Sequence, residues 1–207
     1  MARRPYRMRR RGALAEETRQ RIVQATSQLH SEQGIAETSM KQIAARAGVS
    51  IGAVYHHFPT YDDAIVACAR HNADLVPLPG REIFDGLTSP AQRIERLAAE
   101  LFGYYAQLPV LARVRCDAAK FPPLQHFLAE QKREIRALVS AALDAGRSDR
   151  VAVQTVTALL NFAVYRALQE SGLTAKQAAA RITDVILAWL GTAAARTGRR
   201  PTGKKGS

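Results

Sequence analysis

Apolar residues recur every three or four positions along almost the whole chain, and this spacing limits the fold more than any other feature. Residues on one face of a helix recur at this interval. The alternation typical of half-buried strands is absent, and aromatic residues, which strands favour, make up only 6% of the 207 residues. The sequence therefore predicts an all-α protein.

Capping signals and helix breakers divide the chain into helices. Ser89-Pro90-Ala91-Gln92 and Thr174-Ala175-Lys176-Gln177 each place a Ser or Thr three residues before a Gln, which is the pattern of a helix start. Glycines such as Gly34, Gly48 and Gly172 are typical of helix ends. The expected helices cover residues 14–33, 40–47, 50–57, 61–76, 90–108, 110–119, 123–145, 149–171 and 175–195.

The basic character of the chain is concentrated at its two ends. The net charge is +12, with six arginines and no acid in residues 1–11, and five Lys or Arg and no acid in residues 192–207. The remaining 19 basic and 18 acidic residues leave the body nearly neutral. An excess of positive charge indicates an anionic partner, and here that excess belongs to the two tails.

Several classes of protein are excluded by motif and composition. Two cysteines, Cys68 and Cys116, cannot form a disulfide framework, and His56-His57 has no further ligands at metal-binding spacing. We therefore expect no cofactor and no metal. No hydrophobic leader segment or membrane-length apolar run is present, which predicts a cytoplasmic protein. The sequence motifs of common enzyme classes are also missing, so we expect no catalysis.

The most informative segment runs from Thr38 to Phe58. Small residues (Ala44, Ala47) precede Gly48, and Ile43, Val49 and Val54 are spaced to fill the wedge between two short helices. This pattern indicates a helix-turn-helix, although an ordinary helical hairpin would share part of it. A small polar surface on the second helix and an arginine-rich segment before the unit favour DNA binding, because the second helix of this motif enters the major groove.

This segment resembles the DNA-binding domain of the TetR family of transcriptional regulators. The shared residues are Thr38-Ser39, Ile43-Ala44, Ala47-Gly48-Val49-Ser50, Gly52 and Tyr55-His56-His57-Phe58. The resemblance implies a homodimeric, all-helical repressor that binds a palindromic operator and is released by a small molecule. Together with the charge distribution, it predicts four parts: a basic disordered arm (1–13), the helix-turn-helix DNA-binding domain (14–60), a helical ligand-binding and dimerisation domain (61–195) and a basic disordered tail (196–207).

The DNA contacts expected from this resemblance lie at the start of the first helix of the motif and along the second. They are Ser39, Lys41, Ser50, Ile51, Gly52, Ala53, Tyr55, His56 and His57. Family members often carry a lysine just after the turn that follows the second helix, whereas Tyr61-Asp62-Asp63 stands here. Residues 50–54 also contain no Arg, Asn or Gln for a bidentate base contact. Affinity should therefore depend on phosphate contacts and on the arm.

Within the arm, Arg9, Arg10 and Arg11 are the residues expected to contact DNA. Arginines inserted into a narrow minor groove read A·T-rich segments. A solvated tail without specific contacts is the alternative interpretation.

Helices 149–171 and 175–195 carry the most apolar faces, and the resemblance implies that they pair with the same helices of a second subunit. The expected dimer residues are Val156, Leu160, Ile182, Val185, Ile186 and Trp189. A monomeric core accounts for the same pattern, so both interpretations stay open at this point.

Aromatic and polar residues within apolar helix faces are candidates to line an effector cavity. They are Phe102, Tyr104, Tyr105, Arg115, Cys116, His126, Asn161, Phe162 and Tyr165. Their chemistry suggests a lipophilic or aromatic effector, although each could equally be an ordinary core or surface residue. The competing function for the whole chain is a basic helical scaffold that binds nucleic acid non-specifically through its tails.

Overall fold

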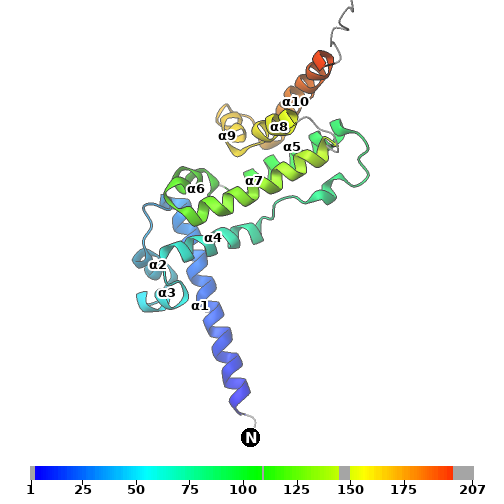
Figure 1. The fold of residues 1–207 in the computed structure, drawn as a ribbon. Coiled ribbons are helices and arrows are strands. Elements are labelled where there is room, and N and C mark those ends of the chain that lie inside the picture. Colours follow the sequence, from blue (N-terminus) through cyan, green and yellow to red (C-terminus); the bar gives the residue numbers. More distant parts are fainter. Residues whose placement is uncertain (1–2, 109, 145–149, 198–207) are drawn as a thin grey trace, which may run out of the picture. The chain divides into compact units, whose positions relative to one another are not determined.

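The structure is a computed structural model that describes residues 3–108, 110–144 and 150–197, and these residues form helices without any strand (Figure 1). The all-α expectation is confirmed. The elements are α1 (Arg3–Gln33), α2 (Met40–Ala47), α3 (Ile51–His57), α4 (Tyr61–Leu75), η1 (Arg81–Phe84), α5 (Pro90–Ala106), α6 (Leu111–Asp117), η2 (Ala118–Lys120), α7 (Pro122–Ala142), α8 (Arg150–Leu159), α9 (Phe162–Glu170) and α10 (Ala175–Thr197).

The predicted capping boxes form as the sequence indicates. At α5, the backbone amide of Gln92 donates to Ser89 Oγ at 3.2 Å, and the amide of Ser89 donates to Gln92 Oε1 at 3.3 Å. Thr174 and Gln177 make the same reciprocal pair at the start of α10. Each pair satisfies amides that the first helical turn leaves without partners, so these helix starts are set locally.

The basic segment expected to be disordered over residues 1–13 is instead helical from Arg3, and it continues into α1 without a break. Arginine is a good helix former, and Pro5 lies in the first turn, where its missing amide proton removes no helical bond. The basic tail expected from residue 196 lies outside the described residues beyond Thr197.

The single helix expected over residues 149–171 is divided into α8 and α9. Asn161 lies at the break, and its Oδ1 accepts from the amides of Ala163 at 2.7 Å and Val164 at 3.0 Å. A side chain that caps a new helix start competes with continuation of the old helix, which explains the break. Among the described residues, no single helix has the length and apolar character to cross a membrane, and α8 and α9 pass that test only as a bent pair.

The chain folds into two compact units. Unit 1 consists of the chain up to Pro77 together with Leu108–Gln131, and unit 2 consists of Leu78–Gln107 and the chain from Lys132 onward. This division differs from the boundary expected at residue 60. The reason is that α4 packs on α1, and that Leu124 of α7 packs in a cluster with Ile35 and Ile65.

Each unit has its own buried core. In unit 1, Ile22, Ile43, Val54 and Ala64 join α1, α2, α3 and α4 around one apolar cluster. In unit 2, α5 packs along α10, and α8 and α9 also contact α10. The fully buried side chains of unit 2 include Ile94, Leu97, Leu101, Phe102, Leu160 and Ile186.

Candidate functional site

The helix-turn-helix of unit 1 is built from α2, a tight turn and α3. Ser39 caps α2, where its Oγ accepts from the amide of Gln42 at 3.3 Å. Gly48 follows the last residue of α2 with φ of +64°, a backbone conformation that glycine adopts without strain. Ser50 then caps α3 and accepts from the amide of Ala53 at 3.1 Å. The turn expected at Gly48 is thus confirmed.

The apolar wedge expected between the two helices is also present. Ile43 and Val54 are completely buried, and Ala44 and Ala47 are buried where the helices approach. Val49 packs against the same cluster from the turn. Because these side chains face inward, the opposite face of α3 is left to solvent.

That outward face gathers most of the residues expected to contact DNA. Ile51 and Tyr55 have exposed fractions of 43% and 51%, which is unusual for large apolar side chains and leaves both available to a partner. The remaining exposed members of the predicted set are Ser39, Lys41, Ser50, Gly52 and His56, whereas Ala53 and His57 are half-buried.

Gly52 lies in this face, and no contact within the fold requires a glycine at this position. A Cβ placed there would meet only Ser50 Oγ, at 3.9 Å, so the fold leaves open space above the backbone. Glycine in a helix interior is unfavourable by about 0.5–1 kcal/mol relative to alanine. The bare backbone is therefore better explained by close approach of a partner than by packing within unit 1.

His57 is placed where the end of α3 meets α1 and α4. Burial lowers the pKa of His57, and the nearby cations His56 and Arg19 lower it further. The guanidinium of Arg19 lies over the ring of Phe58, at 5.3 Å from the ring centroid. Arg19, His57 and Arg70 also line a cavity of about 420 Å³ beside α4. Sequence reasoning missed Arg19 and Arg70, because their positions depend on packing between helices.

The acids that replace the expected lysine have a structural role. Asp63 Oδ2 accepts from the amide of Thr60 at 3.0 Å and from its hydroxyl at 2.7 Å, which completes a capping box at the start of α4. Asp63 is therefore engaged in starting the helix, and its negative charge is favourable there.

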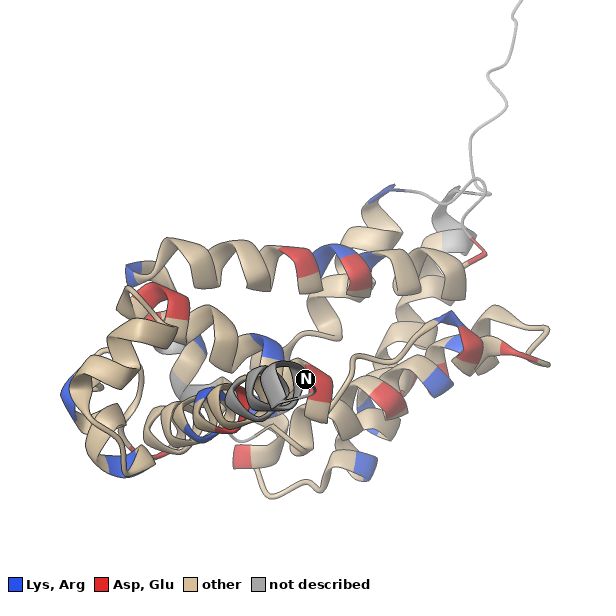
Figure 2. Ribbon diagram, turned by 90° about the horizontal axis from the view of Figure 1, so that it is seen from below, with Lys and Arg blue, Asp and Glu red and all other residues tan. Residues whose placement is uncertain are grey.

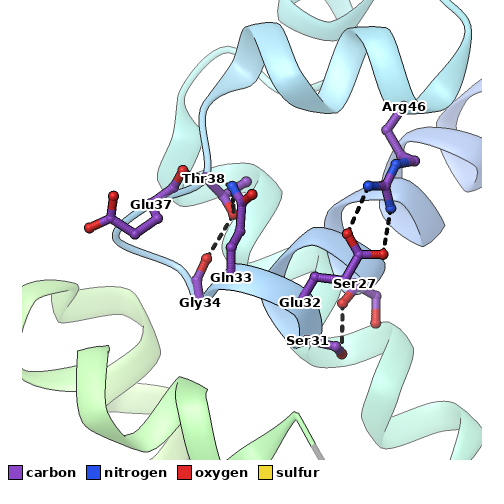
Figure 3. Close-up of polar contacts among 8 residues, drawn as sticks. All are labelled: Ser27, Ser31, Glu32, Gln33, Gly34, Glu37, Thr38 and Arg46. Atoms are coloured by element: carbon purple, nitrogen blue, oxygen red, sulfur yellow. Dashed lines mark hydrogen bonds and ion pairs between the residues drawn. The ribbon is translucent and has the colours of Figure 1, made fainter.

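An exposed ion pair joins α1 to α2. The two terminal guanidinium nitrogens of Arg46, Nη1 and Nη2, each donate to one carboxylate oxygen of Glu32 at 2.8 Å, as Figure 3 shows. The hydrogen bonds from Arg46 lower the pKa of Glu32 and raise that of Arg46. Such a planar, two-point contact fixes direction as well as distance, so it orients α2 against α1.

The loop between α1 and α2 is held by its own side chains. Thr38 Oγ1 donates to the carbonyl of Gly34 at 2.7 Å, and Gln33 Nε2 donates to the carbonyl of Glu37 at 2.7 Å (Figure 3). From α4, the Tyr61 hydroxyl donates its single proton to the carbonyl of Ile35 at 2.6 Å. The hydroxyl oxygen therefore accepts the hydrogen bond from His30 Nε2 at 3.0 Å. Burial lowers the pKa of His30 to about 4, against the opposing effect of Asp117.

The arginines of the expected arm, Arg9, Arg10 and Arg11, belong to the first part of α1, and their side chains lie outside the described ones. The described part of α1 that follows carries both signs of charge, as Figure 2 shows. Glu16 and Glu17 precede Arg19 and Arg21 there. A contact between the arm and DNA stays a prediction.

The aromatic members of the predicted effector site come together in unit 2. Phe102, Tyr104 and Tyr105 of α5 and Phe162 and Tyr165 of α9 are all buried. Ring centroids lie 5.4 Å apart for Phe102 and Tyr165 and 5.6 Å apart for Tyr105 and Phe162. The Tyr105 hydroxyl donates to the carbonyl of Leu160 at 3.2 Å. These rings pack as a core cluster.

The polar members of the predicted effector site are placed differently. Asn161 caps α9, and Arg115 and His126 are exposed residues of unit 1 rather than unit 2. The side chain of Cys116 lies outside the described ones. That these residues share one cavity with the aromatic rings stays a prediction. Pattern-based reasoning placed them on apolar faces, but only packing decides which face a short helix buries.

Unit 2 has an open cavity of about 910 Å³ that sequence reasoning did not find. Its lining comes from η1, α5 and α7 and consists of Arg81, Glu82, Phe84, Asp85, Arg93, Ala137, Ser140, Ala141 and Asp144. Asp144 carries φ of +55°, and its carboxylate lies 3.8 Å from Arg93. No apolar periodicity marks η1, so this cavity has no signature in the sequence.

Four of the residues expected at the dimer interface are buried within one protomer. Val156, Leu160, Ile182 and Ile186 have exposed fractions of 6% or less, so they belong to the core of unit 2 and not to its surface. The apolar stripe of α10 packs on α5, which explains the correction. Val185 is exposed and Trp189 is half-exposed, so these two stay candidates.

The two capped helices, the tight glycine turn and the exposed face of α3 define a helix-turn-helix protein. The family model described as bacterial regulatory proteins of the tetR family matches residues 22–66, from α1 into α4.

Two curated relatives resemble the N-terminal part. HTH-type transcriptional regulator HbdR of Aromatoleum sp. (strain CIB) is 36% identical over 93 residues, which are 45% of this chain and 39% of that protein. SrpR of Pseudomonas putida is 50% identical over 70 residues, covering 32% of this chain and 33% of its own length. The similarity thus spans less than half of either relative.

Solved structures extend the similarity over the fold. A TetR-like transcriptional regulator from Rhodococcus sp. RHA1 is 18% identical with a TM-score of 0.67, and the match covers 85% of this chain and 96% of that one. The multidrug binding protein EbrR, solved with malachite green, is 23% identical with a TM-score of 0.61, covering 82% and 95%. At this identity the likeness concerns the fold.

Proposed function

We propose that this chain is a sequence-specific transcriptional repressor that binds a palindromic operator as a homodimer and dissociates when a small lipophilic or aromatic effector binds. The observation that carries the proposal is the outward face of α3, where Ile51 and Tyr55 are exposed beside the bare backbone of Gly52. A helix of this kind fits the major groove, and its neighbours supply contacts to phosphate.

Selection of operators from random DNA duplexes at a fixed salt concentration tests this function. A repressor should enrich one palindromic site bound about 10³-fold or more above random DNA. A scaffold that coats nucleic acid through its basic tails would enrich none, and that result would contradict the proposal.

Tyr55 provides a sharper test of the surface itself. As a phosphate contact, Tyr55→Ala should weaken binding to all sequences by roughly 10-fold without changing which site is preferred. Leu75→Ala is the matched control, because Leu75 is also a large exposed apolar residue of unit 1 but lies at the end of α4. Equal affinities for both variants would mean that α3 does not face DNA.

The arginine segment at the start of α1 should strengthen binding electrostatically. Deleting residues 2–11 removes six arginines and is expected to weaken operator binding and to flatten its dependence on salt, since each phosphate contact releases counterions. An unchanged salt slope would show that the segment stays in solvent.

Homodimerisation follows from the need for two recognition helices, because operator half-sites lie about 34–36 Å apart. The apolar residues that support it are Val151 of α8 and Val185 of α10, which are 56% and 53% exposed. Light scattering at micromolar protein concentration should give the mass of a dimer, and a monomer would contradict this part of the proposal.

The buried rings of unit 2 support an aromatic or lipophilic effector. An apolar molecule that enters between these rings would replace the contacts between them with contacts to the effector itself. Malachite green, the dye in the EbrR structure, is a direct probe. Its binding should lower operator affinity through a coupling of about 1–3 kcal/mol. Dye binding without any change in operator affinity would contradict a switch at this site.

A further inference from the structure

The loop between α1 and α2 is held from a distant part of the chain. A single carboxylate oxygen, Oδ2 of Asp117, accepts from the amide of Ile35 at 2.9 Å and from the amide of Ala36 at 3.1 Å. The two residues it holds lie 82 and 81 positions away in the sequence. Hydrogen bonds to an ionised acceptor are about twice as strong as neutral ones, so this contact is a firm anchor.

The loop is shaped to admit this carboxylate. Gly34 has φ of +92°, and a Cβ at that position would lie 3.1 Å from Asp117 Oδ2. The Asp117 side chain is 17% exposed, and its other oxygen lies 3.7 Å from Lys120 Nζ. Together with the Tyr61 hydroxyl on the carbonyl of Ile35, the carboxylate fixes both sides of the loop backbone.

The anchored residues lead directly into the DNA-binding surface. Ala36 lies three positions before Ser39, which caps α2 and belongs to the face expected to contact DNA. Three residues span at most about 11 Å, so a movement of Ala36 beyond the slack in this short segment is passed on to Ser39. The position of the loop therefore sets the position at which α2 begins.

Asp117 is the last residue of α6, and α6 has an unusual place in the chain order. Leu108–Gln131 folds as part of unit 1, but the chain enters this segment from unit 2 and returns to unit 2 after it.

We infer that Asp117 is a positioning residue for DNA binding: by holding the amides of Ile35 and Ala36, it keeps α2 and α3 where the operator is recognised. This inference rests on the proposed function and adds to it a residue outside the helix-turn-helix on which DNA affinity depends. Asp117 itself contacts no DNA in this scheme.

The sign of the expected effect separates positioning from simple electrostatics. Removing a negative charge from a DNA-binding unit should strengthen binding to phosphate. Asp117→Ala should instead weaken binding to the selected operator by about 10-fold, within the range of ordinary coupling between sites. Asp117→Asn makes the same change of charge but keeps one oxygen for both amides, so it should retain wild-type affinity within about twofold.

The experiment uses the full chain and the duplex that wild-type protein selects, and it measures amide hydrogen exchange and operator affinity for each variant. Asp117→Ala should raise exchange at Ile35 and Ala36 by about 10-fold or more. Asp74→Ala is the control, because Asp74 is an exposed carboxylate of α4 in the same unit. If Asp117→Ala does not fold, Asp117→Glu tests the same point: it keeps the charge, moves the carboxylate by one methylene and should also weaken binding.

Faster exchange in Asp117→Ala together with unchanged operator affinity would overturn the inference and leave the proposed function intact. Weakened binding in Asp117→Asn equal to that in Asp117→Ala would also overturn it, since the shared oxygen would then not matter. Failure of the wild-type protein to select any duplex would overturn the proposed function, and the inference with it.

Discussion

The stability of unit 1 should depend on pH through His30. This side chain is 1% exposed, and its Nε2 donates to the Tyr61 hydroxyl oxygen. Burial lowers its pKa from 6.5 to about 4, although Asp117 acts in the opposite direction. The folded protein therefore keeps His30 neutral at pH values at which the unfolded chain has already bound a proton.

The size and sign of the effect follow from linkage. Between pH 4 and 6.5 the unfolded state binds more protons than the folded state, so the free energy of unfolding rises with pH across this window. One pKa unit corresponds to about 1.4 kcal/mol. A pKa of about 4 in place of 6.5 therefore makes the pH-dependent contribution of His30 to the free energy of unfolding about 3 kcal/mol. It is fully present above pH 6.5 and is lost as the pH falls to 4.

Urea unfolding of the wild-type protein and of His30→Gln over a series of pH values measures this contribution. Glutamine keeps an N–H donor for Tyr61 but does not titrate, and the titration of all carboxylates cancels in the comparison. The difference in unfolding free energy should narrow by about 2–3 kcal/mol between pH 7.5 and 4.5. A difference that stays constant within about 0.5 kcal/mol would refute the assignment of a neutral, buried His30.

One variant in each unit tests its packing, and a third tests the dimer interface. Tyr61→Phe leaves the Ile35 carbonyl and His30 without their shared partner, and urea unfolding should show a loss of about 2–4 kcal/mol, whereas the exposed Tyr55→Phe should change little. In unit 2, Ile186→Ala should cost about 2–5 kcal/mol because Ile186 is completely buried. Val185→Lys should leave protomer stability intact and weaken the dimer; light scattering that shows an undiminished dimer would exclude Val185 from the interface.

The parts of the fold that follow from local chemistry could be predicted from the sequence. Ser89 with Gln92, the turn at Gly48 and the buried pair of Ile43 and Val54 each depend on residues a few positions apart. These signals act within one or two helical turns, so no knowledge of tertiary packing is needed to interpret them. The exposed face of α3 was predictable for the same reason.

The parts that depend on distant packing could not be predicted. Asn161 could continue a helix or cap a new one, and the pattern of apolar residues around it is compatible with both. The stripe containing Ile182 and Ile186 is equally suited to a partner subunit and to α5. The contact between Asp117 and Ile35 spans 82 residues and has no local signature at either end.

Gly52 affects which amino-acid substitutions this protein can accept. Since a Cβ there meets almost nothing within the fold, larger residues at this position should be tolerated by the folded protein, and alanine should even stabilise α3. The constraint on residue 52 then comes from the partner alone. If α3 recognises the operator as proposed, residue 52 is a site at which operator preference can be altered without destabilising unit 1. Variation there would then alter which genes the protein controls before it altered how well the protein folds.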